Sequence, residues 1–224
     1  VAADGLSNLC SPGVMGGALI VVGEDYGEGA SIIQERTLAM AMKSTIWLFD
    51  PRPDLQNIVD MVEQSFELSE ASNTPVMMQL RIRSCHVQGE FIAKNNRAPK
   101  VGTKNRFTDP AVFDYDRLAH PPVTFSHEKL KVSARLPAAQ RYIVEHGLNE
   151  LIEGEQKSVG IIVQGGIYNI LMRRLQVMGL ADAFGNSKIP VLVLNVTHPL
   201  VPDQITDFCA GKNAVLMVEE GNPE

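Results

Sequence analysis

Apolar runs alternate with helical patterns twice along this chain, and that alternation restricts its fold more than any other feature. In the first segment, residues 17–23, 45–49 and 75–82 form apolar runs that predict buried strands. Between them, residues 32–42 and 54–70 carry apolar side chains at helical spacing. Because strands that alternate with helices form parallel sheets covered by those helices, we predict an α/β fold.

The C-terminal segment repeats the same alternation. Helices are predicted at 138–151, 167–178 and 203–210, and strands at 158–164, 190–196 and 214–218. Between the two segments, residues 94–127 lack periodicity and are rich in Asn, Lys, Arg, Pro and Asp, which indicates a linker or a functional loop. We therefore predict two small three-layer α/β domains with mainly parallel sheets, at residues 1–93 and 127–224, joined by a linker at 94–126.

Composition narrows the class of protein. Apolar residues make up 45% of the 224 residues and charged residues 21%, which is typical of a globular chain and excludes a disordered tail, a collagen-like fibre and a membrane bundle. The formal charge of −6 is spread without blocks of one sign, which argues against nucleic acid or a membrane surface as a partner. No apolar run reaches the roughly 18 residues that span a bilayer.

The cysteines and the chain ends carry two further expectations. Cys10, Cys85 and Cys209 are odd in number, far apart and without metal spacing, so we expect a reduced, cytoplasmic protein. No HxxxH or CxxC pattern occurs, and we predict no metal site. The chain does not begin with methionine and ends shortly after its last predicted strand, so we expect an excised piece of a longer protein.

The loop after the first predicted strand is the first candidate site, because ligands of open α/β sheets bind beyond the carboxyl ends of strands. It contains Glu24, Asp25, Tyr26, Glu28 and Ser31 among three glycines. Ser31 is placed to cap the next helix, whose N-terminus favours an anion, whereas the three carboxylates favour a cation. The alternative is a glycine-containing turn with a solvated acidic rim. The dinucleotide pattern GxGxxG fails at its last glycine, and no Walker lysine is present.

Gln34, Glu35 and Arg36 open the following helix. One interpretation is a buried Glu–Arg pair beside a cofactor. The other is an acidic residue at the surface of the first turn, where the helix dipole favours it.

Arg81, Arg83, Cys85 and His86 follow the third predicted strand. If the chain stays extended there, Arg81, Arg83 and Cys85 face one side, and two arginines on one face can clamp a carboxylate or a phosphate. His86 then orients a substrate or transfers a proton. The alternative is a hydrogen-bonded structural role for all of them.

Weaker candidate site residues follow the predicted strands of the C-terminal segment. Gly165 and Gly166 indicate either a phosphate-facing turn or simply a tight strand-to-helix turn. His198 follows a strand but lies beside prolines that favour a shaped turn. Glu219 and Glu220 also follow a strand, where an exposed acidic pair is the ordinary outcome.

Several of these stretches together resemble a known family. Residues 13–37 (GVMGGALIVVGEDYGEGASIIQERT), residues 65–86 (SFELSEASNTPVMMQLRIRSCH) and the stretches VLNVTHPLVPDQI and VLMVEEGNP look like indolepyruvate ferredoxin oxidoreductase. In particular, they are similar to the α-type portion of the long, fused 2-oxoacid:ferredoxin oxidoreductases of bacteria. The resemblance is collinear over most of the chain and is weakest at residues 94–117.

The resemblance implies a parent enzyme that uses thiamine diphosphate, Mg²⁺ and 4Fe-4S clusters. It would oxidatively decarboxylate aryl 2-oxoacids with coenzyme A, giving an acyl-CoA, CO₂ and reduced ferredoxin. Residues 1–93 would form the later half of a pyrimidine-binding (Pyr-type) domain, and residues 127–224 a transketolase C-terminal-like domain. The implied partners are the remaining domains of the parent, ferredoxin, coenzyme A, the 2-oxoacid and a second copy in a homodimer.

By the same resemblance, residues 24–31 and the pair Gln34 and Glu35 would face the cofactor or substrate cleft. Arg83 and His86 would fall in an Arg–Ser–His-like stretch of the family. The glutamate that contacts the aminopyrimidine would lie upstream, and neither the GDG diphosphate motif nor a series of cluster-binding cysteines occurs in this chain. We therefore assign no certain catalytic residue, and we expect this chain by itself to be inactive and without bound cofactor.

Two other classes of function stay open at the level of the sequence. The first is a non-catalytic α/β module that binds a partner or assembles subunits. The second is an unrelated nucleotide-binding α/β protein, which ATP or NAD would stabilise against heat.

Overall fold

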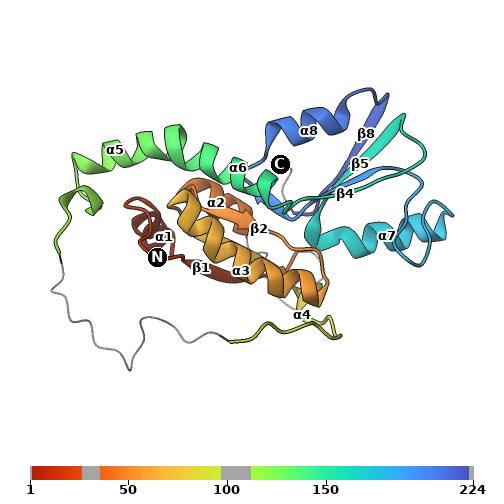
Figure 1. Ribbon diagram of the computed structural model, residues 1–224, viewed down its shortest axis with the longest axis horizontal. Coiled ribbons are helices and arrows are strands. Elements are labelled where there is room, and N and C mark those ends of the chain that lie inside the picture. Colours follow the sequence, from red (N-terminus) through yellow and green to blue (C-terminus); the bar gives the residue numbers. More distant parts are fainter. Residues whose placement is uncertain (1, 27–35, 97–111, 222–224) are drawn as a thin grey trace.

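The computed structural model describes residues 2–26, 36–96 and 112–221, and within them the chain forms two four-stranded sheets with helices on their faces (Figure 1). The strand order is β1-β3-β2-β7 in the first sheet, sheet A, and β4-β6-β5-β8 in the second, sheet B. In each sheet three strands are parallel and one edge strand, β7 or β4, is antiparallel. The predicted α/β class with mainly parallel sheets is confirmed.

Sheet A is built mostly from the first third of the chain. Its strands are β1 (Leu19–Glu24), β2 (Trp47–Phe49), β3 (Val76–Arg81) and β7 (Val196–His198). The helices of this part are α1 (Ala2–Cys10), α2 (Thr37–Ser44), α3 (Leu55–Ser72) and the short α4 (Ile82–Cys85). The α3 helix begins where the Asp54 side chain accepts the Asn57 backbone N–H, and it ends at Asn73 in a left-handed conformation.

Alternate residues of sheet A point to opposite layers of helices. Trp47 and Phe49 pack on one face in a cluster with α3 residues, while Leu48 and Met77 pack on the other face with α1 and α2. In β2 and β3 side chains on both faces are buried, which explains why these strands are continuous apolar runs rather than alternating ones.

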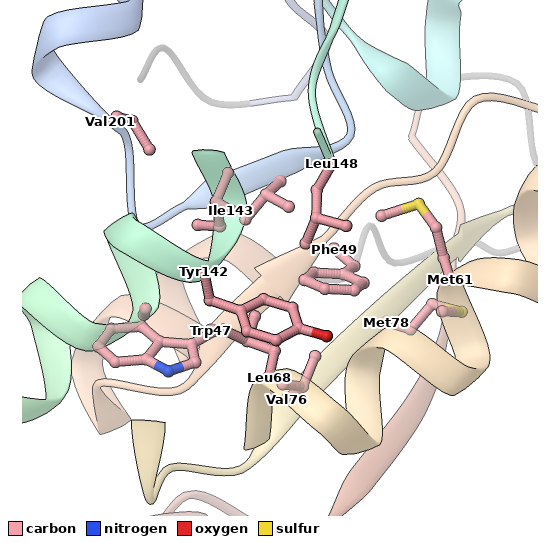
Figure 2. Packing of buried hydrophobic residues seen from close by; sticks show 12 residues of the cluster. Trp47, Phe49, Met61, Leu68, Val76, Met78, Tyr142, Ile143, Leu148 and Val201 are labelled. Carbon is pink, nitrogen blue, oxygen red and sulfur yellow. The ribbon is translucent and has the colours of Figure 1, made fainter. Parts of the chain in front are cut away.

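A long helical segment from the second half of the chain covers sheet A as well. It runs through α5 (Val123–Leu130), the π-helical η2 (Lys131–Arg135) and α6 (Leu136–Glu145), after the 3-10 turn η1 (Tyr115–Arg117). Figure 2 shows Tyr142 and Ile143 of α6 packed in the same cluster as Trp47 and Leu68. The two halves of the chain therefore share one hydrophobic core on this side.

Sheet B has the same layered arrangement. Its strands are β4 (Glu150–Ile152), β5 (Val159–Gln164), β6 (Val191–Leu194) and β8 (Ala214–Val218), and its helical elements are η3 (Gly165–Ile167), α7 (Tyr168–Val177) and α8 (Pro202–Cys209). Val163 and Val193 face α7, whereas Ile162 and Leu192 face α8. Figure 1 shows α7 and α8 on opposite sides of the sheet.

The prediction of one strand at 190–196 is wrong, because the chain leaves sheet B at Asn195 and enters sheet A. Asn195 is fully buried; its Nδ2 donates to the Leu148 carbonyl (3.0 Å) and to Glu150 Oε1 (2.8 Å), and its Oδ1 accepts the Arg52 N–H (2.8 Å). Its own carbonyl accepts the Asp50 N–H at 2.8 Å. One amide side chain thus satisfies the polar groups that the change of sheet would otherwise leave buried without partners.

Three more expectations need correction or restriction. The helix predicted at 138–151 is wrong at its end, because α6 stops at Glu145 and β4 follows. Within the predicted linker, the described residues hold η1 and the start of α5, so that part is not structureless. The domain limits themselves stay a prediction.

Among the described helices, none combines the length and apolar character that a bilayer span needs.

Candidate functional site at the junction of the two sheets

The carboxyl ends of strands from both sheets meet around one buried arginine. Arg81 ends β3 and is 3% exposed. Its Nη2 lies 2.6 Å from Asp50 Oδ2, just beyond β2, and 2.8 Å from Gln164 Oε1 at the end of β5. Its Nη1 donates to Glu220, beyond β8, at 2.7 Å. This cluster of Arg81, Asp50, Gln164 and Glu220, called the junction network below, joins sheet A to sheet B.

The charges of the junction network hold Arg81 as a permanent cation. Burial lowers the pKa of its guanidinium, but Asp50 and then Glu220 more than offset this effect and raise that pKa above its usual value. Arg81 also donates to Asp50 through Nε, so the contact between the two side chains is bidentate. Because both are almost fully buried, each depends on the other for compensation of its charge.

Two glycines of η3 let sheet B approach this ion pair. A Cβ at Gly166 would lie 2.5 Å from Arg81 Cδ and would overlap the atoms that join Arg81 to Asp50. A Cβ at Gly165 would lie 2.8 Å from Asn195 Oδ1. Both glycines are buried, so their close packing favours the tight-turn interpretation over a phosphate-facing one.

Glu24, at the end of β1, has a structural role. It is 2% exposed, and its Oε2 accepts the Thr37 backbone N–H (3.1 Å) and hydroxyl (2.6 Å) at the start of α2. Its Oε1 accepts the N–H of Asp25, which is half-buried. The carboxylate therefore stabilises the N-terminus of α2, where the helix dipole favours a negative charge.

Tyr26 lies against the junction network. The Arg81 guanidinium is centred 5.1 Å from the Tyr26 ring, a distance typical of a cation–π contact. A Cβ at Gly221 would lie 2.7 Å from Cε1 of the same ring. Burial, and next the Glu24 charge, raise the pKa of the Tyr26 hydroxyl, so it stays protonated.

Arg83 reaches the junction network from α4. Its Nη1 lies 3.3 Å from both carboxylate oxygens of Glu220, and each of the two side chains is 25% exposed. The expectation that residues 81–85 stay extended is wrong, because α4 forms there, yet Arg81 and Arg83 still meet through Glu220. The expectation of an ordinary exposed acidic pair at Glu219 and Glu220 is wrong for Glu220, which bridges two arginines.

Among the described residues, the predicted His86 does not join the junction network. It follows α4 and is exposed, and its backbone N–H donates to the Arg83 carbonyl. The candidates Glu28, Ser31, Gln34 and Glu35 lie outside the described residues, and their assignment stays a prediction.

Sequence reasoning missed Asp50 and Gln164 as site residues. Each follows or ends a parallel strand at its carboxyl end, the rule that drew attention to the loop after β1. Applying the rule to every strand would have found both residues.

Among the described residues, no group of three or more His, Cys, Asp or Glu side chains is placed to hold a metal ion. The carboxylates near the junction are already engaged, Asp50 and Glu220 by arginines and Glu24 by α2. Cys10, Cys85 and Cys209 are all unpaired thiols.

Comparison with solved structures identifies the class of fold. The chain superimposes on 2-oxoglutarate:ferredoxin oxidoreductase from Magnetococcus marinus with a TM-score of 0.56 and 15% sequence identity, over 99% of this chain and 43% of that one. Its fold is therefore that of a portion of a 2-oxoacid:ferredoxin oxidoreductase. No family model matches the chain.

Curated relatives narrow this class. The chain is similar over its full length to the indolepyruvate oxidoreductase subunit IorA, with 26% identity to that of Methanothermobacter thermautotrophicus and 28% to that of Pyrococcus abyssi. It covers 34% and 33% of these proteins, so it spans about a third of the length of the curated relatives it matches. The resemblance predicted from the sequence is confirmed over that third.

Proposed function

We propose that this chain is part of an indolepyruvate:ferredoxin oxidoreductase that oxidatively decarboxylates aryl 2-oxoacids to acyl-CoA and reduces ferredoxin. One observation carries the proposal: the similarity to IorA proteins is continuous over the whole chain rather than limited to one motif. The fold shared with a 2-oxoacid:ferredoxin oxidoreductase supports it.

Within that enzyme, the junction of the two sheets would form one wall of the 2-oxoacid site. Arg83 is the residue suited to bind the substrate carboxylate, since its guanidinium is partly exposed beside other polar groups at the carboxyl ends of the strands. Arg81 is fully buried and serves instead to position Arg83 and Tyr26 through Glu220 and the ring contact. Residues 25–31 and the pair Gln34 and Glu35 would line the same cleft, whereas the buried Glu24 fixes the start of α2.

Thiamine diphosphate would supply the nucleophilic carbon for decarboxylation, as its chemistry does in general. Because neither the GDG diphosphate motif nor a series of cluster-binding cysteines occurs in this chain, we assign Mg²⁺, the diphosphate and the 4Fe-4S clusters to other parts of the parent protein. Those parts, ferredoxin, coenzyme A and a second copy are the proposed partners. The unpaired cysteines fit a reducing cytoplasmic compartment.

The proposal is tested with the full-length protein. Purified under anaerobic conditions, it should reduce ferredoxin when indolepyruvate and coenzyme A are both present, and omission of either should abolish the reaction. The chain of 224 residues alone should give no turnover. If the full-length protein reduces ferredoxin with none of the aryl or branched 2-oxoacids, the proposal is wrong.

A further inference from the structure

Glu220 contacts two arginines unequally. It lies 2.7 Å from Arg81 Nη1, but both of its oxygens lie 3.3 Å from Arg83 Nη1. Charge-assisted bonds between a guanidinium and a carboxylate are ordinarily about 2.7–2.9 Å long. The Glu220 carboxylate is therefore bound tightly on the Arg81 side and loosely on the Arg83 side.

The backbone of Glu220 is fixed independently of its carboxylate. Its N–H donates to Gln164 Oε1 at 3.0 Å, and the next residue, Gly221, lies against the Tyr26 ring. A small rotation of the Glu220 side chain changes its distance to Arg83 without moving the end of β8.

We propose that Glu220 is a specificity-determining residue that occupies the anion-binding side of Arg83, and that a small carboxylate ligand binds Arg83 by replacing it. This inference rests on the proposed function, from which the ligand class, a 2-oxoacid, is taken. During the exchange Glu220 keeps its bond to Arg81, and Arg81 keeps Asp50 and Gln164. The junction between the sheets therefore stays closed while one bond is exchanged for another.

The exchange is favourable because the contact that is lost is weak. An ion pair at 3.3 Å whose members are each 25% exposed contributes little, since solvent screens it. An incoming carboxylate can approach the guanidinium at shorter distance and in bidentate geometry. A neutral ligand gains nothing from the exchange, so Glu220 affects only the affinity for anions, which it lowers by competing for Arg83.

The test is a titration of the full-length protein with phenylpyruvate, an aryl 2-oxoacid, and with phenylacetone, which has no carboxylate. Glu220→Gln should bind phenylpyruvate about threefold to tenfold more tightly than the wild type, because the competing charge is gone while the amide oxygen still accepts from Arg81. Glu220→Asp, with a shorter side chain, should give an intermediate gain. Binding of phenylacetone should not change.

Two variants control for general effects. Glu155→Gln removes the same charge at an exposed position. Glu155 precedes the N-terminal end of β5, whereas Gln164 is at its C-terminal end, so the affinity for phenylpyruvate should stay unchanged. In an Arg83→Gln background, Glu220→Gln should no longer increase affinity, since the cation for which the two anions compete is absent.

Several results would overturn the inference. They are an unchanged or lower affinity in Glu220→Gln, an equal gain for phenylacetone, a gain that persists in Arg83→Gln, or no binding of phenylpyruvate to any variant. None of these decides whether the full-length protein reduces ferredoxin, so failure of the inference and failure of the proposed function are observed in separate experiments.

Discussion

Arg81 and Asp50 form a bidentate ion pair that joins the ends of β3 and β2, with Nη2 2.6 Å from Oδ2 and Nε 3.1 Å from Oδ1. Both side chains are almost fully buried, and the first turn after β5 packs directly on them. The turn that follows β5 of sheet B therefore packs on an ion pair that belongs to sheet A.

Removal of one partner of the Arg81–Asp50 ion pair should destabilise the fold. Arg81→Met should lower the free energy of unfolding by about 3–5 kcal/mol, because it leaves the Asp50 carboxylate buried and uncompensated. The matched control, Arg83→Met, removes an arginine that is 25% exposed and should lower it by less than about 1 kcal/mol. Urea unfolding followed by circular dichroism measures both. Equal effects of the two substitutions would contradict the assignment of Arg81 as the buried centre of the junction.

The close approach of η3 to the ion pair leads to a second prediction. Gly166→Ala should lower the free energy of unfolding by about 1–3 kcal/mol, because the added methyl group overlaps Arg81 and Asp50 in a well-packed site. Gly23→Ala, on β1, adds its methyl group where no atom of the described residues lies within 4 Å, and it should change stability by less than about 0.5 kcal/mol. Should Gly166→Ala prove as stable as Gly23→Ala, the packing of the two sheets described here is wrong.

His198 should make stability depend on pH. Burial lowers the pKa of its imidazole below the usual value near 6.5, and its Nε2 has no hydrogen-bond partner among the described residues. The unfolded chain therefore binds a proton more readily than the folded chain, so stability falls as the pH drops below about 6.5. His198→Phe retains an aromatic ring against Trp47, whose centroid lies 5.7 Å from that of His198.

The comparison is between the free energies of unfolding at pH 7.5 and pH 5.5. The wild type should lose more stability than His198→Phe between these two values. An identical loss in both proteins would show that His198 does not titrate in this range.

Much of the fold was predictable because buried parallel strands are continuous apolar runs. β8 was predicted at its observed limits, and β3 and β5 to within one residue at each end. The change of sheet at Asn195 was not, since PVLVLNV is one apolar run and nothing local to it shows that the edge of β2 is free. The turn into α4 was missed for a related reason: four residues are too few for a periodic pattern.

The site was predictable in part. Tyr26 and the two arginines were selected because they follow strands, but the partners of Arg81 lie 31, 83 and 139 residues away along the chain. The contact with Asp50 forms within sheet A, whereas those with Gln164 and Glu220 arise only where the two sheets meet. A single sequence contains no local signal for that meeting, although the position of each partner at a strand end was a usable hint.

The most direct test of the account is the kinetics of Arg83→Ala in the full-length protein, with indolepyruvate as the varied substrate and the oligomer size measured in parallel. If Arg83 binds the substrate carboxylate, KM should rise by about tenfold or more, as expected for the loss of a charge-assisted contact, while the oligomer size stays the same. An unchanged KM together with a shift in oligomer size would contradict the account and would identify the junction as an assembly surface.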